Sequence, residues 1–364
     1  MSNPVFLLFS GHNDRAVITL CRFFSRYKLS FVIVASASSD AIFKTSWADR
    51  VILCRLDQTL DLVLFKQICI ASRTNLEVYQ ELVYCPTSEF MNHFILDQRC
   101  DLELMGLTLN MPSRDVYLKL TNKETSAVIV NKISGLRSPP LLEWSNLSTP
   151  CVFKPKENVA QNGIRYPRLC LTPEDLAYAV NELDPEHWFV QAYISGQSHY
   201  LCGFLSKSGV NSYYWQLNLL QQAGGKSIVL ARTETNPGVN VDILFAGLSK
   251  IGYFGPFMME IIYGEDGQFY YIEINPRFWG PLQLALDACS EVLEMFVIEA
   301  GGEITRPLFS NKQKSWYAWE TGAHLSECRS YPALVDVTVS EIKYLLSSHD
   351  VYAEDDTKLL QNKF

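Results

Sequence analysis

The segment FMMEIIYGEDGQFYYIEINPRFWG, residues 257–280, contains a clear β-hairpin signal. Asp266-Gly267 is the commonest kind of two-residue hairpin loop, because glycine tolerates the positive φ that a type I′ turn requires. The runs on either side, FMMEIIY and FYYIEI, are rich in β-forming residues and contain no proline. If Asp266 and Gly267 form the loop, counting outward pairs Glu265 with Gln268 and Glu260 with Glu273. The sequence therefore predicts an antiparallel hairpin with two opposed carboxylates.

The predicted pairing gives this hairpin an unusual polar face. Directly opposed side chains lie on the same face of a sheet, and Asn275, two residues beyond Glu273, joins them. Two opposed carboxylates repel each other unless a cation lies nearby. Carboxylate and amide oxygens favour hard cations, and Mg²⁺ usually completes its shell with phosphate oxygens and water. We therefore expect a metal–nucleotide site, with Arg277 beside it to bind a phosphoryl oxygen. The alternative is an ordinary amphipathic hairpin whose glutamates face solvent.

Composition and charge restrict the classes of function. The chain has 364 residues, enough for two or three compact units, and its net charge of −8 argues against binding nucleic acid or an anionic membrane over the whole surface. We find neither a basic N-terminal region nor an apolar run of the length that a membrane span needs. The ten cysteines include no CxxC pair, which predicts thiols in a reducing cytoplasm and no structural zinc.

The first part of the chain alternates strands with helices. Such alternation predicts a parallel, doubly wound sheet. The first turn, SGHNDRA, holds one glycine, so the three-glycine dinucleotide motif is missing, which argues against a dehydrogenase. The predicted strands are 5–10, 31–36, 50–56 and 82–85, and the predicted helices are 14–27 and 60–73.

The remaining elements are less regular. An antiparallel sheet that includes the hairpin is predicted from about residue 200, and residues 281–300 are predicted to form one apolar helix. Thr172, Pro173 and Asp175 have the spacing of a helix N-terminus with a capping box. Further predicted elements are a helix at 120–133, a strand at 151–156, a loop at 157–168 and a strand at 187–196.

Two lysines and one strand end suggest a site for an anionic nucleotide. Lys154 lies in the strand CVFKPK, between apolar residues, where lysine is rare without an anionic partner. Lys123 lies upstream in a predicted helix. Each lysine alone is more often a solvated surface residue. The strand in FVQAYISG leads into a turn, and its exposed backbone groups could bind adenine while Tyr193 or Ile194 packs on the ring.

Taken in order, these segments resemble the ATP-grasp superfamily, in particular its carboxylate–amine ligases and carbamoyl-phosphate-synthase-like members. The segments are TNK at 121–123, FKPK at 153–156, VQAYISG at 190–196, GPFMME at 255–260 and YYIEINPRFWG at 270–280. The resemblance implies an α/β (α+β) ATP-grasp fold behind an N-terminal Rossmann-like domain. The implied units are the pre-ATP-grasp domain (1–110), the linker helix and lid (111–198), the central sheet with the metal site (199–300) and a C-terminal extension (301–364).

The resemblance also implies roles for individual residues. Arg277 would stabilise the transferring phosphoryl group, and Arg232, in LARTETNPG, would point at the phosphate or acyl phosphate unless it is a surface arginine. Glu273 would bridge two metal ions. The nucleotide-binding residues would be Lys123 and Lys154 at the phosphates, Gln191, Ala192, Tyr193 and Ile194 at the adenine, and Ser198 at the ribose position. The ligands of Mg²⁺ (or Mn²⁺) would be Glu260, Glu273 and Asn275.

Two features depart from the superfamily pattern. The loop over the phosphates is usually rich in glycine, whereas ENVAQNGIRYPR contains only Gly163, so fewer backbone N–H groups can approach phosphate closely. Many relatives carry an acidic ribose-binding residue where this chain has Ser198, followed by His199. The choice between ATP and GTP therefore stays open.

The implied activity is ATP-dependent ligation. A carboxylate would be activated as an acyl phosphate and joined to an amine, with release of ADP and phosphate. Two alternatives stay open: a catalytically weak nucleotide-binding or regulatory protein, and an enzyme that makes carboxyphosphate from bicarbonate. The partners would be a small-molecule carboxylate and an amine, with no nucleic acid or membrane, and homo-oligomerisation is left open. The acceptors would bind near Ser88, Glu89 and Asn92, although a helix cap alone also explains Ser88 and Glu89.

Overall fold

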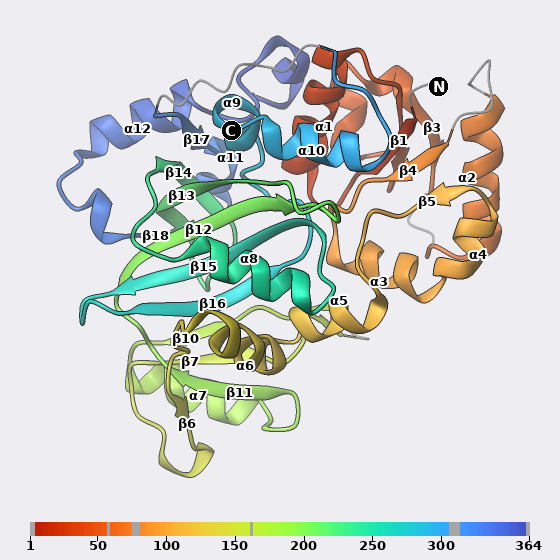
Figure 1. Cartoon of the computed structure of the whole chain (residues 1–364). Coiled ribbons are helices and arrows are strands. Elements are labelled where there is room, and N and C mark those ends of the chain that lie inside the picture. Colours follow the sequence, from red (N-terminus) through yellow and green to blue (C-terminus); the bar gives the residue numbers. More distant parts are fainter. Residues whose placement is uncertain (1–3, 57–58, 75–80, 161–162, 306–313, 362–364) are drawn as a thin grey trace.

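The computed structural model describes residues 4–56, 59–74, 81–160, 163–305 and 314–361. Three main sheets make up the molecule: a parallel sheet at the N-terminus, a small antiparallel sheet and a large antiparallel sheet between them (Figure 1). Among the described residues, no helix combines the length and apolar character that crossing a membrane requires.

The N-terminal sheet is parallel and has the strand order β3-β2-β1-β4-β5. Strands β1 and β2 are apolar and completely buried, as expected where helices cover both faces of a parallel sheet. This confirms the predicted doubly wound arrangement. The strands are β1 (Val5–Phe9), β2 (Phe31–Ala35), β3 (Val51–Cys54), β4 (Leu82–Tyr84) and β5 (Leu107–Thr108). The helices are α1 (Asp14–Tyr27), α2 (Leu62–Thr74), α3 (Glu89–Asp97) and α4 (Arg99–Leu104).

Two helices lead from this sheet to the small one. The helix predicted at 120–133 is divided at Asn122, whose side chain accepts a hydrogen bond from the backbone N–H of Thr125 and so caps the second helix. The helices are α5 (Arg114–Thr121) and α6 (Lys123–Ser134).

The small sheet has the order β10-β7-β11-β6 and is covered by α7 (Pro173–Glu182). Thr172 and Asp175 form the predicted capping box of α7. The loop predicted at 157–168 contains a short ladder between β8 (Val159–Ala160) and β9 (Gly163–Ile164). The strands of the sheet are β6 (Leu141–Leu142), β7 (Cys151–Pro155), β10 (Arg168–Cys170) and β11 (Trp188–Ala192).

The large sheet is antiparallel, with the order β16-β15-β12-β13-β14-β17 and with β18 paired to β13. Helices α6 and α8 (Val241–Lys250) pack on one face, where Val130, Leu244 and Ile261 share one core. On the opposite face, Tyr200, Phe204 and Met258 belong to a core that includes residues of the parallel sheet and of helix α1. The strands are β12 (Gly196–Leu205), β13 (Asn211–Gln222), β14 (Ile228–Glu234), β15 (Gly255–Gly264), β16 (Phe269–Asn275), β17 (Trp316–Ala318) and β18 (Cys328–Ser330).

The β15–β16 hairpin has the predicted pairing of Glu260 with Glu273, but its turn differs from the prediction. Tyr263 pairs with Phe269, and the backbone N–H of Gly264 donates to the Gln268 carbonyl, so the loop has three residues and ends at Gly267, with φ of 74°. The predicted two-residue turn is therefore wrong. The register returns to the predicted one because β16 contains one extra residue, Ile272, as a β-bulge between Tyr271 and Glu273.

Residues 281–300 form two helices, α9 (Gln283–Ala288) and α10 (Glu291–Glu299), and the prediction of one helix is wrong. Cys289 leaves the helical conformation, with φ of −152° and ψ of 62°. The apolar pattern continues through Cys289, so hydrophobic periodicity does not reveal the break.

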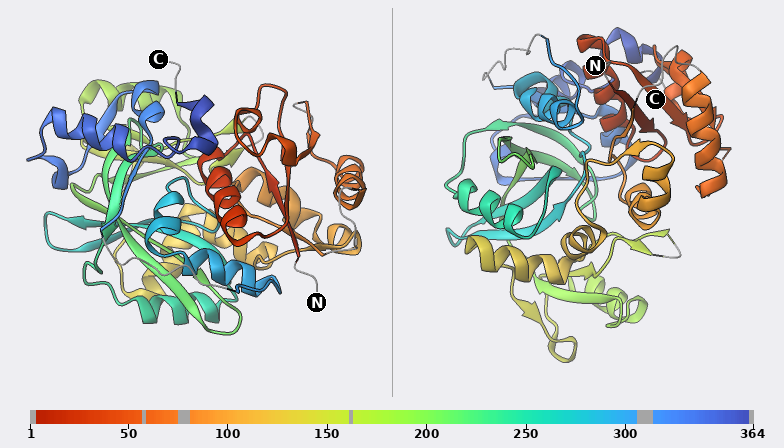
Figure 2. Two further views of the ribbon diagram at one scale, coloured as in Figure 1. Left: turned by 90° about the horizontal axis from the view of Figure 1, so that it is seen from above. Right: turned by 45° about the vertical axis from the view of Figure 1, so that its right-hand side comes forward.

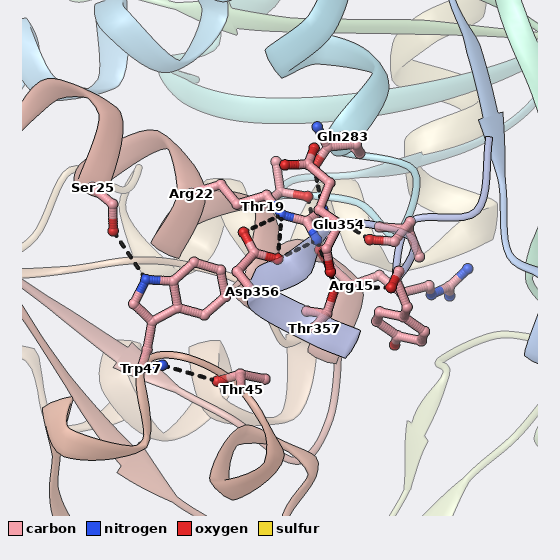
Figure 3. Close-up of polar contacts among 12 residues, drawn as sticks. Arg15, Thr19, Arg22, Ser25, Thr45, Trp47, Gln283, Glu354, Asp356 and Thr357 are labelled. Carbon is pink, nitrogen blue, oxygen red and sulfur yellow. Dashed lines mark hydrogen bonds and ion pairs between the residues drawn. The ribbon is translucent and has the colours of Figure 1, made fainter. Parts of the chain in front are cut away.

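The end of the C-terminal segment, residues 314–361, lies beside helix α1 (Figures 1 and 2). Arg22 of α1, which is 2% exposed, donates through Nε and Nη2 to the carboxylate of Asp356. The same guanidinium donates to Gln283 Oε1 and Thr357 Oγ1, so one buried side chain joins three segments (Figure 3). The α-helices of the C-terminal segment are α11 (Glu320–Leu325) and α12 (Val339–Ser348).

Candidate nucleotide and metal site

A cavity of about 330 Å³ lies between the three sheets. Its wall includes residues from the small sheet, from β15 and β16 of the large sheet, from the loops after β1 and β4 of the parallel sheet, and from the C-terminal segment. Ten residues of the predicted site line this cavity: Lys123, Lys154, Gln191, Ala192, Tyr193, Ile194, Glu260, Glu273, Asn275 and Arg277.

The bulge at Ile272 determines which side chains of β16 reach the cavity. Tyr271 and Ile274 are part of the core beneath the sheet, whereas Ile272, Glu273 and Asn275 line the cavity. In a strand without the bulge, Glu273 would share the face of Tyr271. The extra residue therefore turns Glu273 toward the same side as Glu260.

Glu273 and Glu260 have different electrostatic surroundings. Lys123 Nζ lies 3.1 Å from Glu273 Oε2, and Asn275 Nδ2 donates to Glu273 Oε1 at 2.8 Å. Burial alone would raise the pKa of Glu273, but the charges of Lys123 and Lys154 outweigh burial and lower it to about 2. Burial and the neighbouring charge of Glu273 raise the pKa of Glu260. Glu273 thus forms a direct ion pair with Lys123, whereas Glu260 forms no ion pair among the described residues.

Both predicted lysines are buried, which excludes their alternative as solvated surface residues. Lys123 is the first residue of α6 and is 4% exposed, and Lys154 on β7 is 6% exposed. Lys154 Nζ donates to the carbonyl of Ile272, the bulged residue, at 3.0 Å. Burial and the nearby charge of Lys123 lower the pKa of Lys154. These ammonium groups can donate further hydrogen bonds to phosphate oxygens.

Two cavity residues hold buried polar atoms that have no hydrogen-bond partner among the described residues. Gln191, at the end of β11, is 5% exposed, and its Oε1 is unpaired. Arg277 donates from Nη1 to the Phe278 carbonyl at 3.0 Å, but its buried Nε is unpaired. A buried donor or acceptor without a partner costs free energy, so a ligand that pairs with these atoms would be favoured.

Three predicted residues lie away from the cavity. Ser198 is completely buried and donates to Glu260 Oε1, so it is not available to a ribose. Arg232 lines a separate hollow and forms an ion pair with Glu234 at 2.9 Å, which corrects its expected place at the phosphates. Asn92, in contrast to Ser88 and Glu89, does not line the cavity, because it is buried between the hydroxyls of Tyr84 and Tyr117.

The C-terminal segment contributes two cavity residues that the sequence did not reveal, Arg329 and Tyr331. The Arg329 guanidinium lies 5.5 Å from the ring centroid of Tyr193 and 4.8 Å from that of Tyr331. Tyr331 donates to Gln221 Oε1 at 2.6 Å. The local sequence, ECRSYPA, has no motif that would place it here; the pairing of β18 with β13 does so.

Comparison with known proteins supports the fold but not a close relationship. No protein-family model and no curated protein matches the sequence. Several solved structures match over most of the chain. One is the biotin carboxylase domain of Hydrogenobacter thermophilus 2-oxoglutarate carboxylase, in complex with MgADP, ADP and bicarbonate. It has a TM-score of 0.61 and 15% identity, over 88% of this chain and 76% of that one.

Two further structures agree. Biotin carboxylase from Campylobacter jejuni, as a β-γ-ATP complex, has a TM-score of 0.62 and 12% identity, over 86% of this chain and 75% of that one. N5-carboxyaminoimidazole ribonucleotide synthetase, as an ADP complex, has a TM-score of 0.60 and 14% identity, over 87% of this chain and 82% of that one. Such low identities establish the fold alone. The chain has the ATP-grasp fold, with a parallel α/β unit before it, as the resemblance predicted.

Proposed function

We propose that this chain is an ATP-dependent ligase that activates a carboxylate as an acyl phosphate and joins it to an amine. The observation that carries the proposal is the meeting of Glu260, Glu273 and Asn275 with two buried lysines in one cavity. The likeness to structures that hold ADP or MgADP is consistent with a nucleotide at this place. The proposal retains the predicted units: pre-ATP-grasp domain, lid, central sheet and extension.

The donor set fits a divalent cation. Glu260, Glu273 and Asn275 offer oxygen atoms on one face, which suits Mg²⁺ or Mn²⁺, and Glu260 forms no ion pair among the described residues. When bound, the metal would neutralise phosphate charge and so favour attack on the γ-phosphoryl group. Glu260, Glu273 and Asn275 would hold the metal ion.

The protein's own residues would mainly bind and orient the substrates. Lys123 and Lys154 would contact phosphate oxygens, and the segment from Gln191 to Ile194 would receive the adenine. Arg277 would direct its unpaired Nε–H toward the transferring phosphoryl group. These donors are held in place before the substrate arrives, which is the main requirement of phosphoryl transfer.

The chemistry needs no protein nucleophile. A carboxylate oxygen of the substrate bonds to the γ-phosphorus, and the bond from that phosphorus to the ADP oxygen breaks. The amine nitrogen then bonds to the acyl carbon, phosphate leaves with the electron pair of the C–O bond, and the nitrogen loses its proton.

The carboxylate and amine substrates would bind beside Ser88 and Glu89, between the parallel and large sheets. The lid would keep water from the acyl phosphate. We also propose a cytoplasmic location, which suits ten free thiols.

The test is ADP release from Mg-ATP with pools of carboxylic acids and amines. Sustained ADP release should require both a carboxylate and an amine, and Glu273→Gln should reduce it by at least about a hundred-fold, since the variant loses a ligand and the partner of Lys123. Glu265→Gln, in the exposed hairpin loop, is the matched control. Full turnover by Glu273→Gln would refute the metal assignment.

Two observations favour specific alternatives. The Hydrogenobacter structure contains bicarbonate, which motivates a carboxyphosphate-forming enzyme. ADP release that requires bicarbonate but no organic acid would identify it. The lid loop holds a single glycine, Gly163, which motivates a weakly active regulatory protein. Calorimetric binding of Mg-ATP without ADP release in any pool would favour that function.

A further inference from the structure

A row of buried polar side chains on two neighbouring strands leads to Glu260 on a third strand, β15. Gln216 and Asn218 on β13 and Ser198 on β12 are completely buried. Gln216 Nε2 donates to Asn218 Oδ1, Asn218 Nδ2 donates to Ser198 Oγ, and Ser198 Oγ donates to Glu260 Oε1, each at 2.8 Å. Burial of a polar group costs free energy unless the group is hydrogen-bonded. A continuous hydrogen-bonded row of such side chains inside a sheet therefore suggests a functional role.

The donors in this row have one consistent direction. Asn218 Oδ1 accepts from Gln216, and therefore the amide nitrogen of Asn218 faces Ser198. The Ser198 oxygen accepts that hydrogen bond, so its single proton is left for Glu260. An ionised carboxylate only accepts hydrogen bonds. The row thus presents a donor to the charged form of Glu260.

The two opposed carboxylates depend on different partners. Glu273 is held by Lys123 and Asn275. Within the described part of the chain, Glu260 accepts a hydrogen bond from Ser198 and makes no ion pair. The Ser198 hydroxyl engages Oε1 and leaves the second oxygen of Glu260 for a ligand. Loss of this hydroxyl would therefore free the Glu260 side chain to rotate, without directly changing Glu273.

We propose that Ser198 is a positioning residue that orients Glu260 toward a divalent cation, with Asn218 and Gln216 fixing the direction of its proton. The inference rests on the proposed function, because it takes Glu260 as a metal ligand. It gives Ser198 a role different from the ribose contact that the superfamily resemblance implied. Mutation of a residue that hydrogen-bonds to a metal ligand typically weakens metal binding by about 10- to 100-fold.

The experiment measures Mn²⁺ binding to the full chain with saturating ADP, from the electron paramagnetic resonance signal of free Mn²⁺. Ser198→Ala should weaken Mn²⁺ binding by about ten-fold or more. Ser198→Thr, which keeps the hydroxyl, should stay within about three-fold. The matched control is Ser195→Ala, since Ser195 is exposed and donates to Glu265 at 2.5 Å, away from the cavity. Binding of ADP without metal should be the same in all four proteins.

A second variant probes the proton direction. Asn218→Asp places a carboxylate oxygen where the amide nitrogen was. That oxygen would accept a hydrogen bond from the Ser198 hydroxyl, which would then no longer donate to Glu260. Mn²⁺ binding should therefore weaken although Ser198 is intact. Either Ser198→Ala or Asn218→Asp binding Mn²⁺ as tightly as the unaltered protein would overturn the inference. An equal loss of metal-free ADP binding would also overturn it, because it would indicate a general structural role. If the unaltered protein does not bind Mn²⁺ with ADP, the proposed function fails as well.

Discussion

Asp356→Asn should substantially destabilise the protein, because it removes the charge that balances the buried guanidinium of Arg22. The Arg22 side chain is 2% exposed and that of Asp356 is 21% exposed, with 2.7 Å between Nη2 and Oδ1. Removal of one partner of a buried ion pair costs about 3–5 kcal/mol. The partial exposure of Asp356 and the remaining bonds from Arg22 to Gln283 and Thr357 place the expected loss near the lower end, at about 3 kcal/mol.

The same segment provides a control. Glu354 pairs with Arg26 at 3.5 Å, with side chains 49% and 38% exposed, so Glu354→Gln should cost less than about 1 kcal/mol. The assay is urea unfolding of both variants and the unaltered protein, with the first transition compared if unfolding occurs in several steps. If Asp356→Asn costs no more than Glu354→Gln, the buried pair does not anchor the C-terminal segment.

Three other perturbations have expected outcomes. Lys154→Met should weaken ATP binding by about 10- to 100-fold, because a buried charge-assisted hydrogen bond to phosphate is lost; calorimetry with Lys156→Met as control checks this. Burial raises the pKa of Asp350 to about 6. Since this folded-state pKa exceeds the unfolded value, the contribution of Asp350 to stability is lost as pH rises from about 4 through 6. Asp350→Asn should therefore gain up to about 3 kcal/mol relative to the unaltered protein between pH 4 and 7, and equal pH profiles in urea unfolding would contradict this. Gly247→Ala would place Cβ 2.5 Å from Ile133 Cβ, so it should lower unfolding free energy by about 1–3 kcal/mol; an unchanged urea midpoint would show that α6 and α8 can separate freely.

The secondary structure could largely be predicted because its signals are local. The helix at Asp14–Tyr27 and the capping box of Thr172 and Asp175 follow from spacing within a few residues. The failures were also local in origin. Nothing in the apolar pattern shows that Cys289 interrupts a helix, and Asp266-Gly267 suits a two-residue loop as well as the three-residue loop that forms. The Glu260–Glu273 pairing was nevertheless right, since the bulge at Ile272 compensates for the turn.

The residues of the candidate site could be predicted only where sequence segments match those of the ATP-grasp superfamily in the same order. Lys154 and Glu260 are far apart in the sequence, yet both line the cavity, as the resemblance implied; their roles stay a proposal. Ser198 and Arg232, to which the resemblance also gave roles in the site, do not line the cavity. Successive side chains of a strand point to opposite faces of the sheet, and the sequence of the strand does not show which face contacts a ligand.

The amino-acid sequence by itself determined most of the helices and strands, the opposed carboxylates and the superfamily likeness, because these depend on residue types at short, fixed spacings. Only the tertiary structure decided that Ser198 bonds to Glu260, that Lys154 reaches the bulged Ile272, and that Arg329 enters the cavity from the C-terminal segment. Contacts between distant segments depend on how the sheets pack, and no local pattern encodes that packing.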